Sequence, residues 1–375
     1  MNKIAKIGTD NFDKAKYNVG EEMEEADAML VRSADLHETE FPATLDCIAR
    51  AGAGVNNIPL DKCADAGIVV FNTPGANANG VKEIVLAGLF LASRDIVGGI
   101  EWAKGLEGDA DAAKKVEKGK SQFAGCEILG KTLGVIGLGA IGRLVANAAD
   151  ALGMTVVGCD PYLPDDVAAQ LCPNVKKVAS YDELYAVSDY VTLHIPATAE
   201  TKGMFNKDVF AKMKDGVKLL NFSRDALVNT ADLIDALNSG KIAKYVVDFP
   251  TADTIGVHAN IIAIPHLGAS TEESEDNCAV MAAKQTIDYL ENGNIVNSVN
   301  YPKFVMDRAS DNRICVLAKG ADIGAIAAAV GKSVASGSAT KGDYLYAVYD
   351  VEGEVSEEKT QEIAAVAGVI RVRAL

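Results

Sequence analysis

The sequence TLGVIGLGAIGR occupies residues 132–143. Its apolar run ends at the first of three glycines, Gly137, Gly139 and Gly142, and a helical pattern follows from Arg143. In a strand–turn–helix unit, the first glycine permits a tight turn, the second lets backbone N–H groups approach a pyrophosphate, and the third lets the helix pack closely on the sheet. The helix N-terminus favours the same phosphates. The stretch therefore predicts a dinucleotide-binding turn, and the alternative is a glycine-rich turn that binds nothing.

An acidic residue, Asp160, follows the next predicted strand. A carboxylate at this place accepts hydrogen bonds from the adenosine ribose hydroxyls and repels a 2′-phosphate. Residues 161–163 read PYL and supply no arginine or lysine for such a phosphate. The pattern therefore favours NAD over NADP as the cofactor.

Predicted strands and helices alternate on both sides of this turn, which is typical of parallel α/β sheets. Before it we expect strands at residues 28–31, 49–53 and 68–72, helices at 41–47, 59–66, 81–93 and 98–106, and an exposed connection over 105–119. From it onward we expect strands at 132–136, 155–159, 190–194, 218–221, 244–247 and 261–264, then a helix at 270–291 that begins with a Ser-x-x-Glu capping box.

The last 65 residues have a different order of elements. We expect strands at 313–317, 332–335, 344–351 and 370–374 and helices at 323–330 and 356–367. This βαββαβ order is ferredoxin-like. The predicted fold class is therefore α/β, with two Rossmann-like, doubly wound parallel-sheet domains and a small ferredoxin-like C-terminal domain.

Composition narrows the class of protein. Lys and Arg minus Asp and Glu give 36 − 52 = −16, so we expect no nucleic-acid partner and no anionic membrane partner. The seven cysteines are scattered and never spaced C-x-x-C, which disfavours a disulfide framework or a metal site and favours a reducing compartment. MNKIAKIGTD shows no signal-peptide pattern and no apolar stretch is long enough to span a bilayer, so we expect a cytoplasmic protein.

Two chemically active side chains follow predicted strands of the cofactor domain. Arg224 follows the strand at 218–221, and His266 follows the strand at 261–264. Ligands of open α/β sheets bind at the carboxyl ends of the strands. An arginine can clamp a carboxylate with two hydrogen bonds, and a histidine can exchange a proton near neutral pH. Each residue alone fits a surface ion pair or an ordinary loop residue, but together they predict a catalytic site.

Motifs in this chain resemble, in the same order, those of the D-isomer-specific 2-hydroxyacid dehydrogenases. They are FAG at 123–125, LGKTLGVIGLGAIG at 129–142, HIPAT at 194–198, NFSR at 221–224 and PHLGAS at 265–270. The phosphoglycerate dehydrogenase branch of the family is similar in VRS at 31–33, RAGAGVNNI at 50–58, NTPGANAN at 72–79 and the C-terminal module. The resemblance covers nearly the whole chain.

The resemblance implies three domains and a catalytic set. Residues 1–95 with 268–302 would form a discontinuous substrate-binding domain, 96–267 the NAD-binding Rossmann domain, and 311–375 a regulatory or oligomerisation domain similar to ACT modules. The family's catalytic arginine falls on Arg224 and its catalytic histidine on His266. Its acidic partner for the histidine, a glutamate, falls on Asp253, which either pairs with His266 or is a solvated loop residue.

Family contacts with the cofactor fall on the glycine-rich turn and on the strand ends beside it, namely Gly137, Gly139, Ala140, Ile141, Gly142, Asp160, His194, Pro196, Thr198, Ser223, Asp248 and Gly268. For His194 we favour a positional role, and the alternative is a buried strand-end residue. Family contacts with the substrate fall on Arg32, Ser33, Gly52, Ala53, Gly54, Val55 and Asn79. Arg32 and Ser33 would hold a phosphate, and the alternative for Arg32 is an exposed strand-end charge.

By this resemblance we expect NAD-dependent oxidation of 3-phospho-D-glycerate to 3-phosphohydroxypyruvate, the first step of serine biosynthesis. One alternative is another D-2-hydroxyacid substrate, such as glycerate, hydroxypyruvate or lactate. The other is an NAD(H)-sensing protein without catalysis. A homodimer or higher homo-oligomer is implied, with an amino-acid effector such as serine at the C-terminal module; the alternative there is a dimerisation module without a ligand.

Overall fold

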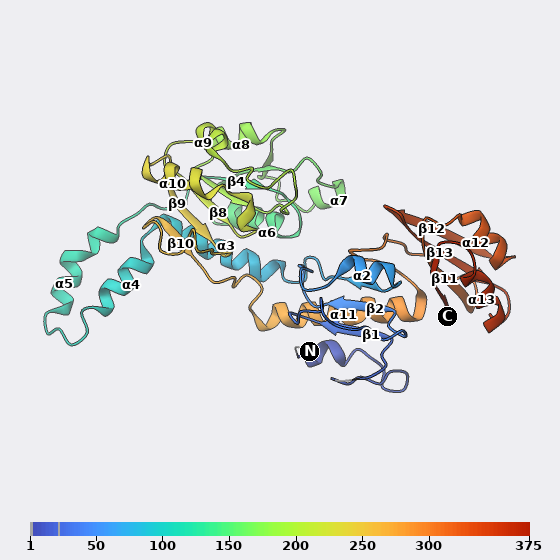
Figure 1. Cartoon of the computed structure of the whole chain (residues 1–375). Helices are drawn as coiled ribbons and strands as arrows, with labels where there is room; N and C mark the ends of the chain where they lie inside the picture. Colours follow the sequence, from blue (N-terminus) through green and yellow to red (C-terminus); the bar gives the residue numbers. More distant parts are fainter. Residues whose placement is uncertain (1–2, 22) are drawn as a thin grey trace. The chain divides into compact units, whose positions relative to one another are not determined.

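The computed structural model describes residues 3–21 and 23–375, and the chain divides into two compact units (Figure 1). The first consists of Met1–Asn77 and Glu272–Leu375, and the second of Ala78–Thr271. The second unit therefore begins at α3 (Ala78–Ser93), earlier than the predicted boundary after residue 95, because Val85 and Leu89 of α3 are fully buried in its core.

The second unit is built on a seven-stranded parallel sheet. Its strands are β4 (Thr132–Ile136), β5 (Thr155–Cys159), β6 (Lys176–Lys177), β7 (Tyr190–Leu193), β8 (Val217–Asn221), β9 (Ile242–Val247) and β10 (Ile261–Ala263). The spatial order is β10-β9-β8-β7-β4-β5-β6. After β4 the chain adds β5 and β6 on one side of it and then β7 to β10 on the other side. Open α/β sheets bind ligands at such a switch point.

Helices cover both faces of this sheet. One core cluster joins the sheet to α3 and α6 (Ala140–Ala151), and the other joins it to α8 (Tyr181–Val187), α9 (Lys207–Lys212) and α10 (Thr230–Asn238). The short helix α7 (Asp165–Ala168) and the 3₁₀ turn Asp225–Leu227 complete the connections. The predicted doubly wound architecture is confirmed.

Two helices extend from this unit as an arm (Figure 1). They are α4 (Ile96–Lys104) and α5 (Ala112–Gly119), followed by the 3₁₀ turn Lys120–Phe123. The segment over 105–119 is exposed as expected, but its second half forms a helix that the sequence analysis did not predict. Residues 112–119 read AAKKVEKG, in which strong helix formers outweigh the high charge. The Trp102 ring packs against Phe123, with ring centroids 5.5 Å apart.

The first unit holds a three-stranded parallel sheet in the order β1-β2-β3, with strands β1 (Ala28–Val31), β2 (Cys47–Arg50) and β3 (Val69–Phe71). Its helices are α1 (Lys6–Thr9), α2 (Leu60–Asp65) and α11 (Glu272–Asn292). The helix predicted over 41–47 is wrong. Residues 41–46 form a turn and irregular chain, and Cys47 starts the buried central strand, whose pairing on both sides outweighs local preference.

The same unit contains a four-stranded antiparallel sheet in the order β12-β13-β11-β14. Its elements are β11 (Asn312–Lys319), α12 (Ile323–Val330), β12 (Ala335–Lys341), β13 (Tyr344–Val351), α13 (Glu357–Ala364) and β14 (Val369–Ala374), which is the predicted βαββαβ order. The strand expected at 332–335 instead runs to Lys341. Lys341 pairs with Tyr344 across a two-residue turn in which Gly342 has a φ of 57°, so β12 must lie directly against β13.

One hydrophobic core joins the two sheets of the first unit. Cys47, Ala49 and Phe71 of the parallel sheet belong to the same buried cluster as Cys315 and Tyr346 of the antiparallel sheet. The other face of the antiparallel sheet is covered by α12 and α13, which bury Ile326 and Ile363. The C-terminal module is therefore part of the first unit.

Candidate active site

The glycine-rich turn joins β4 to α6. Gly137 has a φ of 85°, and a side chain there would overlap the His194 carbonyl oxygen. A side chain at Gly142 would overlap the Gly137 carbonyl oxygen, so this glycine allows the helix to approach the turn. A side chain at Gly139 would meet no atom within 4 Å. The space in front of Gly139, at the N-terminus of α6, therefore fits a pyrophosphate that approaches the backbone closely.

Asp160 lies next to this turn. Its Oδ2 accepts a hydrogen bond from the Leu138 N–H over 2.9 Å, and its Oδ1 accepts one from the Tyr162 N–H over 3.0 Å. Each carboxylate oxygen retains a second acceptor position. The two backbone donors thus orient the carboxylate beside the turn, where it can accept hydrogen bonds from ribose hydroxyls.

His194 follows β7 and lies behind the glycine-rich turn. Its Nε2 is 3.0 Å from Thr192 Oγ1, and its Nδ1 is buried without a hydrogen-bond partner in the described residues. Burial lowers the pKa of His194 to about 3. The ring is therefore neutral at physiological pH, which suits the predicted positional role. Pro196 and Thr198 lie in the exposed loop that follows, where the Pro196 carbonyl oxygen accepts a hydrogen bond from Thr201.

The ends of three neighbouring strands, β8, β9 and β10, carry Arg224, Phe249 and His266 respectively. The Phe249 ring contacts both Arg224 and His266. Its centroid is 4.3 Å from the His266 ring centroid and 5.0 Å from Arg224 Cζ. The structure thus brings together the predicted catalytic arginine and histidine, and adds an aromatic residue that the sequence had not singled out.

Asp248, directly before Phe249, is a buried carboxyl group. It is 1% exposed, and its Oδ1 has no hydrogen-bond partner among the described residues. Burial raises its pKa to about 7, although its own backbone N–H and the charge of Arg224 lower it in part. Gly268 lies beside the other oxygen, because a side chain there would stand 3.4 Å from Oδ2. A buried acceptor without a donor fits the carboxamide of a nicotinamide ring.

Asn221 organises the loop that carries Arg224. Its fully buried amide donates to the Arg224 carbonyl oxygen over 2.8 Å and to Tyr245 Oη over 3.1 Å, and its Oδ1 accepts from the Ser223 N–H. Ser223 Oγ donates to the Leu193 carbonyl oxygen over 2.7 Å. Sequence reasoning missed the supporting roles of Asn221 and Tyr245, which depend on the pairing of β8 with β9.

Asp253 lies in the exposed loop after β9. Its pairing with His266 stays a prediction.

The predicted phosphate and carboxylate contacts lie mostly in the first unit. Arg32 follows β1, and its Nη2 is 2.6 Å from Glu275 Oε1 of α11. The Arg32 carbonyl oxygen accepts from Arg50 Nε over 3.0 Å. Gly52 has a φ of 149°, and a side chain there would overlap the Arg50 guanidinium. The positive φ favours glycine at this position, and a side chain there would also require the Arg50 side chain to move.

The rest of this set is exposed or partly exposed: Ser33, Ala53, Gly54, Val55 and Asn79. Asn79 belongs to the second unit, where its side chain donates a hydrogen bond to Glu83 and accepts one from Lys82.

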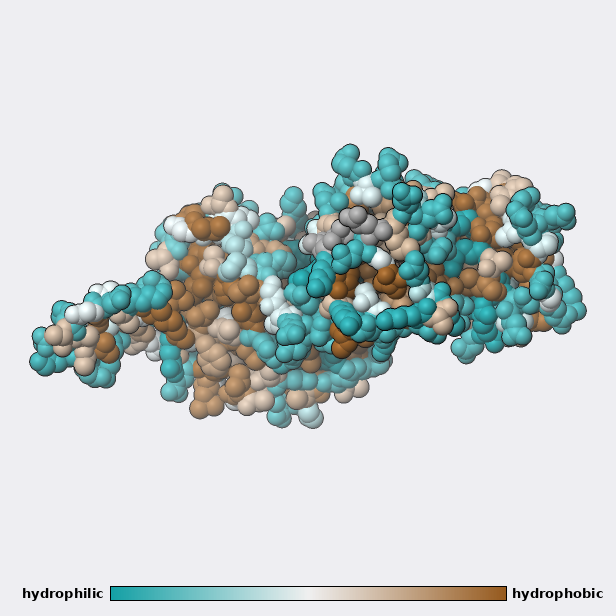
Figure 2. Space-filling view, turned by 90° about the horizontal axis from the view of Figure 1, so that it is seen from below, coloured by the Kyte–Doolittle hydropathy of each residue, from teal (hydrophilic) through white to brown (hydrophobic). Residues whose placement is uncertain are grey.

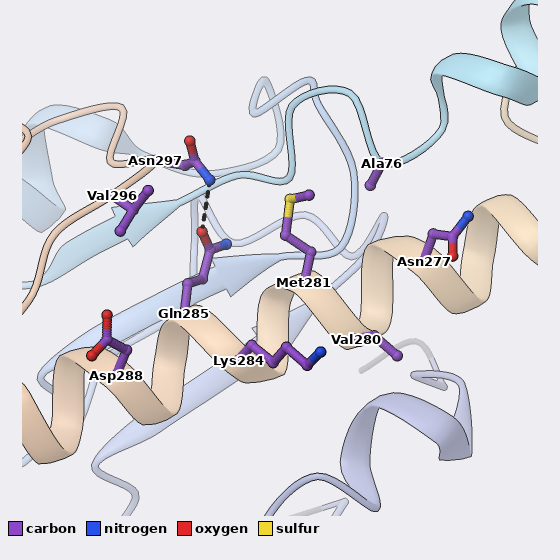
Figure 3. A pocket seen from close by; sticks show the side chains of 9 residues that line it. All are labelled: Ala76, Asn277, Val280, Met281, Lys284, Gln285, Asp288, Val296 and Asn297. Atoms are coloured by element: carbon purple, nitrogen blue, oxygen red, sulfur yellow. Dashed lines mark hydrogen bonds between the residues drawn. The ribbon is translucent and has the colours of Figure 1, made fainter. Parts of the chain in front are cut away.

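A hollow of about 760 Å³ runs along α11 in the first unit (Figure 3). Gln285 lies at its floor, donates to the Asn72 carbonyl oxygen over 2.8 Å and accepts from Asn297 Nδ2 over 3.2 Å. These bonds attach the NTPGANAN segment to α11. No predicted site residue lines this hollow.

In the described residues, no cluster of His, Cys, Asp or Glu is arranged to hold a metal ion, and no helix is long and apolar enough to cross a membrane.

Comparison with known proteins places this geometry in a family. Residues 100–268 match the NAD-binding domain of D-isomer-specific 2-hydroxyacid dehydrogenases. This segment belongs to that family. Residues 100–268 are thus the chain's NAD-binding domain, and NAD is the cofactor of such a domain.

Among 2-hydroxyacid dehydrogenases, the chain is similar to curated D-3-phosphoglycerate dehydrogenases. It is 33% identical to that of Bacillus subtilis, over 80% of this chain and 57% of the relative, and 32% identical to that of Methanocaldococcus jannaschii, over 92% and 63%. The chain therefore spans about half to two thirds of the length of the curated relatives it matches.

Solved structures share the fold. An NAD⁺-bound 3-phosphoglycerate dehydrogenase of Entamoeba histolytica has a TM-score of 0.58 and 28% identity, covering 75% of this chain and 83% of that one. A glyoxylate reductase of Paecilomyes thermophila has a TM-score of 0.61 and 27% identity, covering 72% and 83%.

Proposed function

We propose that this chain is an NAD-dependent dehydrogenase that oxidises 3-phospho-D-glycerate at C2 to 3-phosphohydroxypyruvate, and reverses the reaction. The observation that carries the proposal is the contact of Arg224 and His266 with one ring, at the strand ends of an NAD-binding domain. The similarity to curated D-3-phosphoglycerate dehydrogenases supports the choice of substrate.

In the oxidation, Arg224 holds the substrate carboxylate and stabilises charge that develops on the C2 oxygen. His266 takes the hydroxyl proton from that oxygen as the C2–H bond breaks. Bound NAD⁺ supplies the acceptor for the hydride that leaves C2. Asp248, through its unpartnered oxygen, and the turn at Gly139, through its open backbone, would hold the cofactor.

Arg32 and Ser33 bind the substrate phosphate in this proposal. Arg32 already pairs with Glu275, but its guanidinium has five donors and can hold a second anion. The same ion pair is the observation that favours the second candidate, an unphosphorylated D-2-hydroxyacid, because Glu275 neutralises part of the charge that a phosphate needs.

Charge reversal at Arg32 distinguishes the two substrates. If a phosphate binds there, Arg32→Glu raises KM for 3-phosphohydroxypyruvate by at least about tenfold and leaves turnover of hydroxypyruvate unchanged. Lys16→Glu is the matched control, because Lys16 pairs with Glu291 of the same helix, α11, outside the predicted site. Equal effects of Arg32→Glu on both substrates would support the unphosphorylated candidate.

A homodimer through the second unit is also part of the proposal. Exposed apolar side chains occur on α3, on α4, shortly before β4 and at the end of α6, and Figure 2 shows apolar surface beside the helical arm. They are Phe90, Ile96, Val97, Ile100, Leu129 and Leu152. Such a patch favours burial against another protein surface. Light scattering of the purified chain tests this: a dimer is expected, and Ile100→Lys should yield monomer.

Serine or another amino acid as an effector of the C-terminal module remains a prediction. Its test is the rate of NADH oxidation with and without added L-serine.

A further inference from the structure

We propose that Phe249 is a positioning residue that holds both Arg224 and His266 in reacting geometry. This inference rests on the proposed function, because it assigns a role within the same site.

The strand order creates the need for such a residue. β8, β9 and β10 are neighbours, with β9 in the middle. Neighbouring strands lie about 4.8 Å apart, so groups at the ends of β8 and β10 are separated by roughly twice that distance. Phe249 lies past the end of the middle strand and supplies a ring that reaches both sides.

The ring contacts each partner in a favourable geometry. Arg224 Cζ is 5.0 Å from the ring centroid, within the range of a cation–π interaction. The His266 ring lies at 4.3 Å with an interplanar angle of 41°, which is a close tilted contact. The same attraction favours a positive charge on the imidazole after it has taken a proton. One apolar side chain can therefore orient the guanidinium and the imidazole together.

Phe249 is itself held in place. It is half-buried and packs against the core cluster that contains Leu193, Phe210 and Val247. The residue before it, Asp248, is buried and accepts a backbone hydrogen bond from the His266 N–H over 3.0 Å. The ring thus stands on a fixed base, while Asp253 in the same loop is exposed.

Three variants of the full chain test the role. Phe249→Leu removes the ring but keeps an apolar side chain, Phe249→Tyr keeps the ring, and Phe210→Leu removes a ring from the same core cluster away from the site. For each, kcat and KM for 3-phosphohydroxypyruvate, the Kd for NADH and the Tm are measured. Phe249→Met serves as a second ring-removing variant if Phe249→Leu does not fold.

We expect Phe249→Leu to lower kcat/KM by between about tenfold and a hundredfold, mostly through kcat, with the Kd for NADH unchanged. Phe249→Tyr should retain most of the rate, and Phe210→Leu should lower Tm without lowering kcat of the folded protein. A wild-type kcat in Phe249→Leu would overturn the positioning role. So would a loss of kcat in Phe210→Leu as large as that in Phe249→Leu. An inactive wild-type chain would instead overturn the proposed function, and this inference with it.

Discussion

Arg313 and Asp350 form an ion pair in which both side chains are completely buried. Arg313 Nε donates to Asp350 Oδ1 over 2.6 Å, and Nη2 donates to Oδ2 over 3.0 Å. Nη1 also donates to the carbonyl oxygens of Asn292 and Met306. The pair therefore ties β11 and β13 of the antiparallel sheet to the end of α11 and the chain that follows it.

Breaking this pair should be costly. Asp350→Ala leaves a buried guanidinium without its counter-ion, and we expect the free energy of unfolding to fall by about 3 to 5 kcal/mol. The double variant Arg313→Met with Asp350→Leu removes both charges and should recover part of that loss, because the carbonyl oxygens that Arg313 binds lose their donor. Urea denaturation measures both values. If Asp350→Ala were as stable as the wild type, the buried ion pair would not stabilise the fold as predicted.

The C-terminal sheet and the parallel sheet of the first unit should unfold together. Asp46, directly before β2, pairs with Arg371 and with Arg373, each over 2.7 Å, and the two sheets share a core. We expect amides of β2 and β11 to exchange hydrogen with similar free energies of opening. Earlier exchange of β11 in native-state hydrogen exchange would show that the C-terminal sheet is an independent module.

Stability should depend on pH through Asp248. Its pKa is about 7 in the folded chain and near its ordinary value of 3.8 when unfolded. The folded state therefore binds the proton more tightly, and stability falls as pH rises from about 4 to about 7, by as much as about 4 kcal/mol. Asp248→Asn should raise Tm at pH 8 and change it little at pH 4. Asp166→Asn, at an exposed position, is the control. If the stability of Asp248→Asn depended on pH as that of the wild type does, Asp248 would not be the source of the pH dependence.

The glycines of the turn should separate folding from cofactor binding. A side chain at Gly139 enters open space, and its φ of −65° suits alanine, so Gly139→Ala should keep the wild-type Tm but weaken NADH binding at least about tenfold. Gly142→Ala overlaps the Gly137 carbonyl oxygen and should lower Tm. Fluorescence titration with NADH and thermal unfolding measure the two effects. If Gly139→Ala bound NADH with wild-type affinity, the pyrophosphate would not bind at this turn.

Sequence patterns predicted the sheet of the second unit well because the glycine-rich turn and the apolar strands are local signals. They failed at residues 41–47, where strand pairing outweighed local preference, and they did not predict the helix at 112–119, where helix propensity acts in an exposed, charged segment. Motif spacing placed Arg224 and His266 at one edge of the sheet. It did not find Phe249, since its contacts depend on the order of β8, β9 and β10 in space.

The same limit applies to Asp46 and Arg373. Their ion pair joins residues at opposite ends of the chain, and nothing in either local sequence predicts it.

The proposed reaction is tested most directly by NADH consumption of the purified chain, with 3-phosphohydroxypyruvate and hydroxypyruvate offered side by side. We expect rapid turnover of the phosphorylated substrate and a kcat/KM for hydroxypyruvate at least about a hundredfold lower. Equal rates would contradict the phosphate specificity and favour a general D-2-hydroxyacid dehydrogenase. No turnover of either substrate by a chain that binds NADH would contradict the catalytic role and favour an NAD(H)-sensing protein.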